Sequence, residues 1–332
     1  MFNFPKIIKL QLKIYEILKY SSENAKQWNA FVSNSKNGTF LHNRNFMDYH
    51  SDRFNDFSLI ILDNGKWVAI LPANISKNEV HSHQGLTYGG LIYDEKLKLE
   101  SVILVLQTIL KFLNNEKINK LHFKTIPAIY HKKPAEEINY ALFLANAKLV
   151  RRDGLSVLDL QQTNELSKLR KRNINKIKAE NDLSVVWNKT FKPFWETILS
   201  PNLEKKFNAK PVHSLDEIEK LFKYFPKNIH QFDLYKNNEI ICGTTIFETE
   251  TVVHAQYIAG NEGLDYLFNH LINVHFEHKK FFDFGISNEQ QGRKLNVGLS
   301  NFKQSFGAST IVHDCYEIET KNHVLLNDFL IL

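Results

Sequence analysis

The predicted order of strands and helices occurs twice in this chain of 332 residues. Residues 57–126 have the pattern of strand, tight turn, strand, strand, long helix and strand, and residues 232–287 repeat that order. Few residues are identical between the two stretches, so the repeat is one of structure rather than of sequence. It predicts two similar α+β domains. A single mixed α+β domain without a true duplication is the alternative.

The turns and helices of the two stretches support this prediction. Asn64-Gly65 and Asn237-Asn238 each separate two apolar runs, as in type I′ hairpin turns, where both central residues need a positive φ. Helices are predicted over Glu95–Asn114 and Leu264–Lys280 because apolar residues recur there at helical spacing. Strands are predicted at FSLIILD, WVAILPANI, EVHSHQGLTYGGLI and KLHFKTI in the first stretch, and at FDLYK, EIICGTTIFET, TVVHAQYIAG and FFDFGIS in the second.

An antiparallel hairpin, a third strand, a helix and a closing strand form the core of acyltransferases of the GNAT type. Two copies predict tandem GNAT-like domains, each a mostly antiparallel twisted sheet flanked by helices. We place the first domain at 1–160 and the second at 161–311, sizes that suit independent cores.

Composition limits the classes of function. Hydrophobic residues make up 43% and charged residues 23%, as in ordinary soluble globular proteins. The two cysteines, Cys242 and Cys315, exclude a disulfide framework and a thiolate-based zinc site, and we expect no metal. Lysines interrupt the apolar N-terminal stretch MFNFPKIIKLQLKIYEILKY, which we expect to open the first domain as a strand or short helix. We therefore expect a cytoplasmic protein, monomer or dimer, without stable membrane insertion.

The charge of the chain points to an anionic partner. The formal net charge is +6, which suits a nucleotide, coenzyme A, nucleic acid or anionic lipid. Six cations lie within residues 168–178, while Leu169, Ile174 and Ile177 share one helical face. This predicts an amphipathic helix whose cationic side, including Arg172, contacts phosphates. A solvated surface helix is the plainer alternative.

The segment 81–90 combines histidines with glycines at the exit of a predicted strand. Histidine is the usual general base near neutral pH, so His83 and His81 are candidate bases. Tyr88 and Gly89 are candidate substrate contacts, since glycine lets a ligand approach the backbone. An edge strand with a bulge and exposed histidines gives the same pattern.

The segment 253–263 runs along the third strand of the second copy into its helix. In a GNAT fold this strand offers backbone groups to a thioester, and the helix N-terminus holds the pyrophosphate of coenzyme A. Acyl-CoA is therefore the expected co-substrate. The usual Gln/Arg-x-x-Gly-x-Gly/Ala signature is absent, so a simple turn is the alternative. The candidate residues for acyl-CoA are His254, Gln256, Tyr257, Gly260 and Gly263.

The segment 282–307 places polar residues after the last strand of the second copy, where α/β sheets bind ligands. Ser287 and Asn288 are candidate substrate contacts, and Asp283 is either a base or a buried structural carboxylate. Lys303 lies among aromatic residues and is able to neutralise a phosphate or a developing oxyanion. Three nearby histidines have a spacing that does not favour a metal site: His270, His275 and His278.

Three segments together resemble the Fem family of non-ribosomal peptidyltransferases: LRKRNINKIKAEN, the series DFGIS, LN, GL, FK and FGA that ends at Ala308, and FLHNRNFMDYHSDRF. The resemblance implies twin GNAT domains in which residues 312–332 return to the first domain. It also implies a role for Lys303 at the acyl donor or its carbonyl, and a phosphate-contacting cation near His50 and Arg53.

The chain also departs from that family. SHQGLTYGG stands in place of an Arg-Gly-Pro motif, and the coiled-coil insertion of some tRNA-using members is missing. The chain is more similar to twin-GNAT acyltransferases of cell-surface polysaccharide synthesis, such as the FdhC type. This implies transfer of an acyl group, for example 3-hydroxybutyryl, from acyl-CoA to the amine of a dTDP-linked amino-deoxy sugar for O-antigen or capsule.

Two alternatives stay open at the level of sequence. One is a Fem-like transferase that uses aminoacyl-tRNA to modify a peptidoglycan precursor, the only case in which a nucleic acid is an expected partner. The other is a non-catalytic GNAT-like module that no longer binds coenzyme A. The basic helix favours the tRNA-dependent transferase, because RNA affinity depends on phosphate contacts.

Overall fold

The structure, a computed structural model, describes residues 14–180 and 182–329. The first thirteen residues, on which most of the predicted N-terminal strand or helix falls, lie outside the described part. The described chain begins with strand β1 (Glu16–Lys19).

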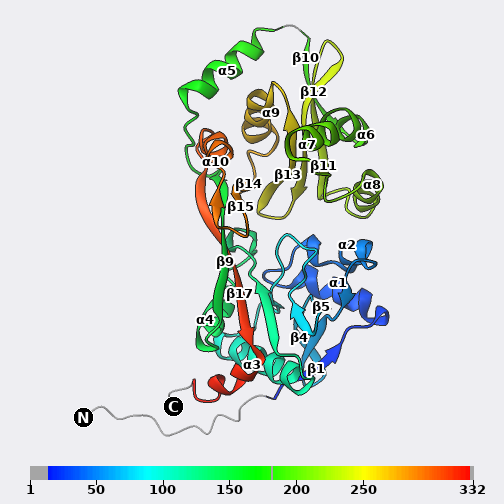
Figure 1. Cartoon of the computed structure of the whole chain (residues 1–332), viewed down its shortest axis with the longest axis vertical. Helices are drawn as coiled ribbons and strands as arrows, with labels where there is room; N and C mark the ends of the chain where they lie inside the picture. Colours follow the sequence, from blue (N-terminus) through cyan, green and yellow to red (C-terminus); the bar gives the residue numbers. More distant parts are fainter. Residues whose placement is uncertain (1–13, 181, 330–332) are drawn as a thin grey trace, which may run out of the picture. The chain divides into compact units, whose positions relative to one another are not determined.

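The chain divides into two compact units. Unit 1 comprises Met1–Val150 and Asp314–Leu332, and unit 2 comprises Arg151–His313. Strands β9 (Lys148–Asp159) and β17 (Ser309–Glu319) each run from one unit into the other, so the chain crosses twice (Figure 1).

Unit 1 has two sheets packed around helix α3. Its strand orders are β1-β3-β4-β7 and β17-β8-β6-β5-β2, and all neighbours are antiparallel except the parallel pair β6 and β8. The C-terminal 3₁₀ segment Thr320–Leu326 packs on α3, and Ile318 and Leu326 are part of the unit 1 core. The elements are α1 (Ala25–Asn34), α2 (Arg44–Met47), α3 (Leu99–Asn115), α4 (Glu137–Leu144), β2 (Asn55–Asp56), β3 (Leu59–Asp63), β4 (Lys66–Leu71), β5 (Asn74–Ser76), β6 (Glu79–His81), β7 (Ile92–Tyr93) and β8 (Lys120–Lys124).

Unit 2 has one main sheet in the order β10-β11-β12-β13-β14-β9, antiparallel except between β13 and β14. Leu234 and Cys242, register partners on one face, pack in the same apolar core as α9, whereas Gly243 on the other face meets Phe194 of α6. The elements are α5 (Lys168–Lys178), α6 (Lys192–Phe194), α7 (Ser200–Phe207), α8 (Leu215–Tyr224), α9 (Leu264–His270), α10 (Val297–Gln304), β10 (Leu183–Asn188), β11 (Ile229–Lys236), β12 (Glu239–Glu248), β13 (Val252–Gly260), β14 (Phe281–Ile286), β15 (Asn288–Glu289) and β16 (Lys294–Leu295).

The predicted mixed α+β fold is confirmed, and both hairpin turns are where the sequence predicts them. Asn64 and Gly65 have φ values of 50° and 76°, and Asn237 and Asn238 have 50° and 63°. All four residues are therefore in the left-handed conformation that type I′ turns require.

Two predicted elements differ from the structure. The helix predicted to reach Lys280 ends earlier: α9 passes into a π-helical turn, Leu271–His275, and then stops. Phe276 turns into the core, while the amine of Lys279 pairs with Glu248 at 2.6 Å instead of capping the helix. The single strand predicted at 79–92 is split into β6 and β7, because a loop containing the left-handed His83 separates them.

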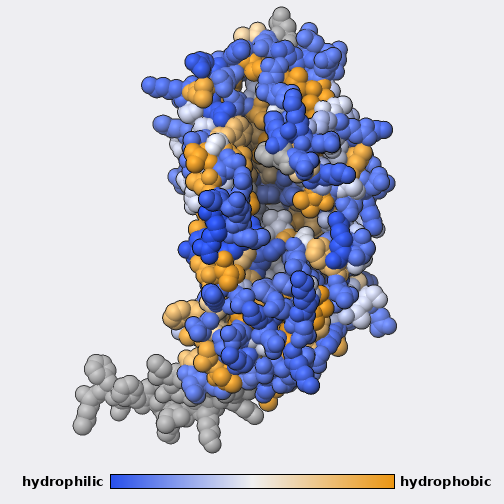
Figure 2. All heavy atoms as spheres, in the orientation of Figure 1, coloured by the Kyte–Doolittle hydropathy of each residue, from blue (hydrophilic) through white to orange (hydrophobic). Residues whose placement is uncertain are grey.

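Hydrophilic residues predominate on the face of the molecule shown in Figure 2, with apolar residues scattered among them. Within residues 14–180 and 182–329, no helix is long and apolar enough to cross a bilayer.

Candidate active site

Strands β13 and β14 of unit 2 form a fork. They pair in parallel only from Val252 to His254, which lie opposite Phe281 to Asp283. Beyond this point β13 continues to Gly260, while β14 turns at Gly285, whose φ is +73°. Two strands that separate in this way leave backbone N–H and C=O groups facing a gap rather than each other. We call this region, with the side chains described below, the β13–β14 fork.

A β-bulge lies on β13 next to the fork. In the ladder with β12, Thr245 is opposite Tyr257 and Ile246 is opposite Ala255, so Gln256 has no partner residue on β12. Bulges release backbone groups from a ladder and are common beside active sites. The side-chain Oε1 of Gln256 is also buried and has no hydrogen-bond partner among the described residues. This polar position is therefore suited to a ligand.

A histidine and an aspartate meet where the two strands part. His254 Nδ1 lies 3.0 Å from Asp283 Oδ2. Asp283 is 1% exposed, and its Oδ1 accepts the backbone N–H of Gly285 at 2.7 Å. A carboxylate at Nδ1 favours the tautomer with the proton on that nitrogen, which leaves Nε2 able to accept a proton. Asp283 is thus a buried carboxylate that orients His254, which is the better candidate base.

Lys303 of α10 binds the far side of the same turn. Its ammonium donates hydrogen bonds to the carbonyls of Gly285, at 3.0 Å, and Ile286. The side chain is 3% exposed, and burial lowers the pKa of Lys303 to about 8, against the opposing effect of the Asp283 charge. The third N–H of the ammonium has no partner within the described part of the chain, so it is available to an oxyanion or phosphate.

The residues after β14 extend the fork. Ser287 is 3% exposed, and its hydroxyl has no hydrogen-bond partner among the described residues. The side-chain oxygen of Asn288 is already used within the protein, because it accepts the N–H of Gly154 at 2.7 Å. Ser287 therefore offers its hydroxyl to a ligand, whereas Asn288 has only its amide N–H groups to offer.

The turn between β13 and α9, predicted to hold a pyrophosphate, is closely packed. A Cβ on Gly260 would lie 2.2 Å from Cys242 Cβ, and one on Gly263, where φ is +85°, would lie 2.5 Å from Leu234 Cδ2. Packing therefore explains both glycines without a ligand.

The start of α9 already has an anion beside it. Asp265 in its first turn forms an ion pair with Arg170 of α5, and its other oxygen accepts a hydrogen bond from Asn173 at 2.7 Å. A carboxylate at a helix N-terminus uses the same favourable interaction that a bound phosphate would use. The basic helix thus contributes Arg170 to the fold, while Arg172 is exposed on its surface.

Tyr257 does not belong to the fork. Its hydroxyl accepts the backbone N–H of His213 at 3.0 Å and lies 2.7 Å from His213 Nδ1, and its ring packs on Trp195. We interpret it as a core residue.

The loop after β6 in unit 1 gathers several other predicted residues. The rings of His50, Phe54 and His83 lie 4.9 to 5.4 Å apart, and a Cβ on Gly85 would lie 2.1 Å from His50 Nε2. Burial, with a smaller contribution from His50, lowers the pKa of His83 to about 3. So weak a base is poorly matched to proton transfer near pH 7. The close ring contacts and the low pKa together favour a packing role for His83.

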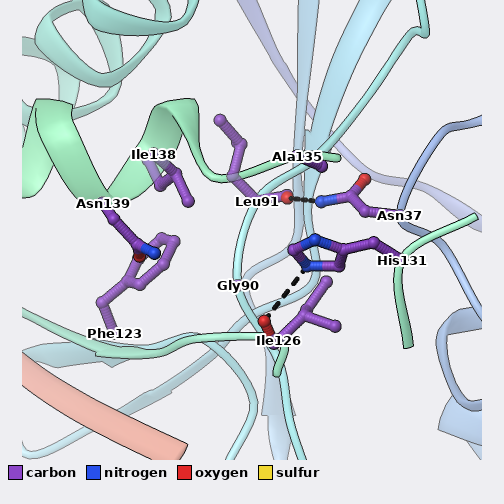
Figure 3. Close-up of a pocket in the computed structure, with 9 residues that line it drawn as sticks. All are labelled: Asn37, Gly90, Leu91, Phe123, Ile126, His131, Ala135, Ile138 and Asn139. Carbon is purple, nitrogen blue, oxygen red and sulfur yellow. Dashed lines mark hydrogen bonds between the residues drawn. The ribbon is translucent and has the colours of Figure 1, made fainter. Parts of the chain in front are cut away.

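Tyr88 and Gly89 are also interior residues. The hydroxyl of Tyr88 donates to Thr39 Oγ1 at 3.2 Å, and a Cβ on Gly89 would lie 1.6 Å from the carbonyl oxygen of Ser82. Gly90 borders a small cavity of about 10 Å³, in which His131 Nε2 is 3.1 Å from the Ile126 carbonyl (Figure 3). Such a cavity is large enough for about one water molecule, not for a substrate.

Arg53 has a more open setting. It is partly exposed, stacks over Tyr49 with its guanidinium carbon 5.3 Å from the ring centre, and lies near Asp52. It also lines a polar pocket of about 320 Å³ in unit 1. The other residues that line this pocket are Ser51, Asp52, Phe54, Asn55, Asn74, Ile75, Ser76 and Gln84.

His81 lies in a different setting from His83. It stacks on His122 with ring centres 4.4 Å apart, and burial lowers the pKa of His81 to about 4.

The pairing of His254 with Asp283 is the main feature that the sequence interpretation missed. The parallel register of the third and closing strands of the second copy was the signal that could have revealed it.

No family model matches the chain, and no curated protein is significantly similar to it in sequence. Solved structures do share its fold. FemX superposes with a TM-score of 0.62 at 10% identity, over 90% of this chain and 96% of FemX. The C-terminal domain (DUF2156) of an Agrobacterium fabrum protein named as a lysylphosphatidylglycerol synthetase gives 0.58 at 12% identity, over 92% and 94%. L-PGS from Bacillus licheniformis gives 0.53 at 12% identity, over 93% and 96%.

These similarities extend over nearly the whole chain. The chain has a two-domain GNAT-like fold, as the repeated order of elements predicts. At 10–12% identity the similarity concerns the fold alone.

Proposed function

We propose that the chain is an N-acyltransferase that works at the β13–β14 fork. One observation carries the proposal. The bulge at Gln256 and the His254–Asp283 pair lie on two strands that separate at this point, and the ammonium of Lys303 in α10 binds the carbonyl of Gly285 in the turn that ends one of them. A base on one strand and a cationic donor at the end of its neighbour are what acyl transfer needs.

The proposed reaction is direct attack of an amine on an acyl carbonyl. Nε2 of His254 takes the proton of the attacking ammonium, directly or through a water molecule. The nitrogen then forms a bond to the carbonyl carbon, and the oxyanion receives hydrogen bonds from backbone N–H groups of β13 and from Lys303. The bond to the leaving thiolate or alkoxide breaks as the oxyanion collapses, the leaving group takes up the second proton of the attacking nitrogen to leave a neutral amide, and the proton held by His254 passes to solvent. Holding both reactants in the fork replaces a bimolecular encounter.

The finer form of the proposal is transfer of an acyl group, such as 3-hydroxybutyryl, from acyl-CoA to a nucleotide-linked amino sugar. The sugar and the acyl chain are part of this proposal and follow from the sequence resemblance alone.

The test is thiol release measured with a disulfide dye, for a set of acyl-CoAs against dTDP- and UDP-linked amino sugars. Release that depends on one sugar, and falls at least about a hundredfold in Lys303→Met, would support the proposal. The matched control is Lys220→Met, which removes an exposed lysine of α8. Equal rates in Lys303→Met and Lys220→Met would exclude a role for the Lys303 ammonium in the reaction.

A second candidate, aminoacyl transfer from charged tRNA, is favoured by a specific observation. The start of α9, where a GNAT-type coenzyme A pyrophosphate is expected, already carries the Asp265–Arg170 ion pair. A donor without that pyrophosphate does not need the position. The exposed cations of α5 also suit RNA phosphates. Loss of the aminoacyl ester from charged tRNA, in the presence of an amine acceptor and absence of acyl-CoA, would identify this donor.

A further inference from the structure

A cluster of three metal-binding side chains lies on the parallel strands β6 and β8 of unit 1. Glu79, His81 and His122 each offer one donor atom, and these atoms lie within 4.8 Å of one another. His81 and His122 are register partners on neighbouring strands, and Glu79 is two residues before His81, so all three project from the same face of the sheet. The cluster belongs to unit 1, whereas the β13–β14 fork belongs to unit 2.

The contacts within the cluster are unusual for a simple ion pair. His122 Nε2 lies 2.7 Å from Glu79 Oε2, which an ion pair explains. His81, however, stacks face to face on His122, with ring centres 4.4 Å apart and planes 8° from parallel. The ion pair does not explain the position of His81, whereas a bound cation would be shared by both rings and the carboxylate.

We propose that Glu79, His81 and His122 bind one divalent transition-metal ion, with Zn²⁺ the best match. Two imidazole nitrogens and one carboxylate oxygen form a ligand set that zinc accepts, usually with a fourth position for water or another ligand. Neighbouring donors in a tetrahedral zinc site lie about 3.3 Å apart, given bonds of about 2.0 Å. The donor atoms of the cluster lie between 2.7 and 4.8 Å apart, a range that includes this distance, so small side-chain rotations would complete the site. The side chains of His122 and Glu79 are 27% and 36% exposed, which leaves room for such rotations and for entry of an ion.

The neighbours on either side define the fourth position. On β5, Asn74 is the register partner of His81, but both ends of its amide are bonded to Gln84, each at 2.8 Å. On β17, Glu317 is the register partner of His122 and forms an ion pair with Lys120 at 3.1 Å. Glu317 is therefore the protein group able to complete the coordination, by releasing Lys120, and water is the alternative fourth ligand.

The site has a structural consequence within unit 1. Only residues 80–81 of β6 and 121–122 of β8 are paired in this parallel ladder, and the loop that carries His83 begins directly after it. A metal ion between these strands would cross-link the ladder at the base of that loop. The proposal does not depend on the proposed acyltransfer, and it differs from the expectation of no metal drawn from the sequence.

The experiment uses the full chain without a polyhistidine tag, stripped with a chelator and titrated calorimetrically with ZnCl₂. We expect one equivalent to bind, and Co²⁺ to give the visible absorption of a low-symmetry nitrogen and oxygen site. His81→Gln and His122→Gln should each weaken zinc binding at least about tenfold, and Glu79→Gln should weaken it measurably. The matched control is His278→Gln, an exposed histidine of unit 2, which should leave the affinity unchanged.

Two results would overturn the proposal. One is the absence of both zinc heat and cobalt absorption in the folded chain. The other is an affinity that is the same in the wild type, His81→Gln and His122→Gln but lower in His278→Gln, which would place the ion among the histidines of unit 2. If His122→Gln unfolds, as circular dichroism would reveal, Glu79→Gln decides the result, because it keeps the shape of the side chain and removes the anionic ligand.

Discussion

Replacement of Lys303 by methionine tests the role of the ammonium in the β13–β14 fork. Methionine keeps most of the length of the side chain but removes its charge and its hydrogen bonds to Gly285 and Ile286. Removal of one donor to an oxyanion typically lowers kcat by about 10²–10³-fold, or roughly 2.7–4 kcal/mol. We therefore expect a loss of that size at pH 7, where a group with a pKa of about 8 is mostly protonated.

The dependence on pH distinguishes this role from a packing role. Because the pKa of Lys303 is about 8, its protonated fraction falls from roughly nine-tenths at pH 7 to one-tenth at pH 9. The advantage of the wild type over Lys303→Met should therefore shrink about tenfold between these two pH values. The acceptor amine titrates in the opposite direction, but it does so equally in both proteins. The ratio of the two rates at each pH removes its contribution.

Stability gives an independent check on the buried charge. The pKa of Lys303 is lower in the folded chain than the ordinary 10.5, so the unfolded chain binds more protons between these two values. The cost of this buried ammonium is complete below pH 8 and declines as the pH rises. From pH 7 to 9.5 the wild type should gain about 2 kcal/mol in free energy of unfolding relative to Lys303→Met.

The assays are steady-state acyl transfer and urea unfolding, both at several pH values. A ratio of rates that stays constant from pH 7 to 9 would refute the role of a titrating ammonium in the reaction. A difference in stability that does not change with pH would mean that the charge is not buried as described. Lys220→Met should behave as the wild type in both assays.

Three further predictions concern unit 2. His254→Asn should lower kcat about 10²–10⁴-fold at pH 7, because it removes the proposed base; an unchanged kcat would exclude that role. Gly263→Ala should destabilise the chain by about 1–3 kcal/mol in urea unfolding, since the residue has a positive φ and the new Cβ would lie 2.5 Å from Leu234; a neutral effect would mean that the turn relaxes freely. Arg170→Ala should cost about 2–4 kcal/mol, because it leaves the mostly buried Asp265 without its cation, and Arg170→Ala with Asp265→Asn should recover part of that loss.

The fold was predictable from local patterns. Hairpin turns such as Asn64-Gly65 depend on the backbone preferences of two residues, and the strands on either side depend on alternating hydrophobicity, so both can be recognised in a sequence. The end of α9 was not predictable in this way. Val274 and Phe276 are equally apolar in sequence, but only Phe276 finds a buried place, among Phe232 and His275, once the helix stops. That choice depends on the rest of the core.

The candidate site was predictable in composition but not in pairing. The sequence singled out Asp283 and His254 separately, yet they are 29 positions apart, and their contact depends on the register of two parallel strands. The same limit applies to Arg170 and Asp265, which are 95 positions apart. Histidines have an added difficulty, because burial decides their basicity. Burial lowers the pKa of His83 to about 3, and the sequence around His83 gives no sign of that burial.

The two crossings of the chain between the units have a consequence for synthesis on the ribosome. Unit 2 is one continuous segment, so it is translated before the part of β17 that belongs to unit 1. The fold of unit 1 is incomplete until β17 has been made, because β17 pairs with β8. Its core also needs Ile318 and Leu326, which follow late in the sequence. The nascent unit 1 therefore carries an unpaired strand edge at β8 until β17 has been translated, a state that is prone to aggregation. A stop codon after His313 would leave unit 2 whole and unit 1 without its closing strand.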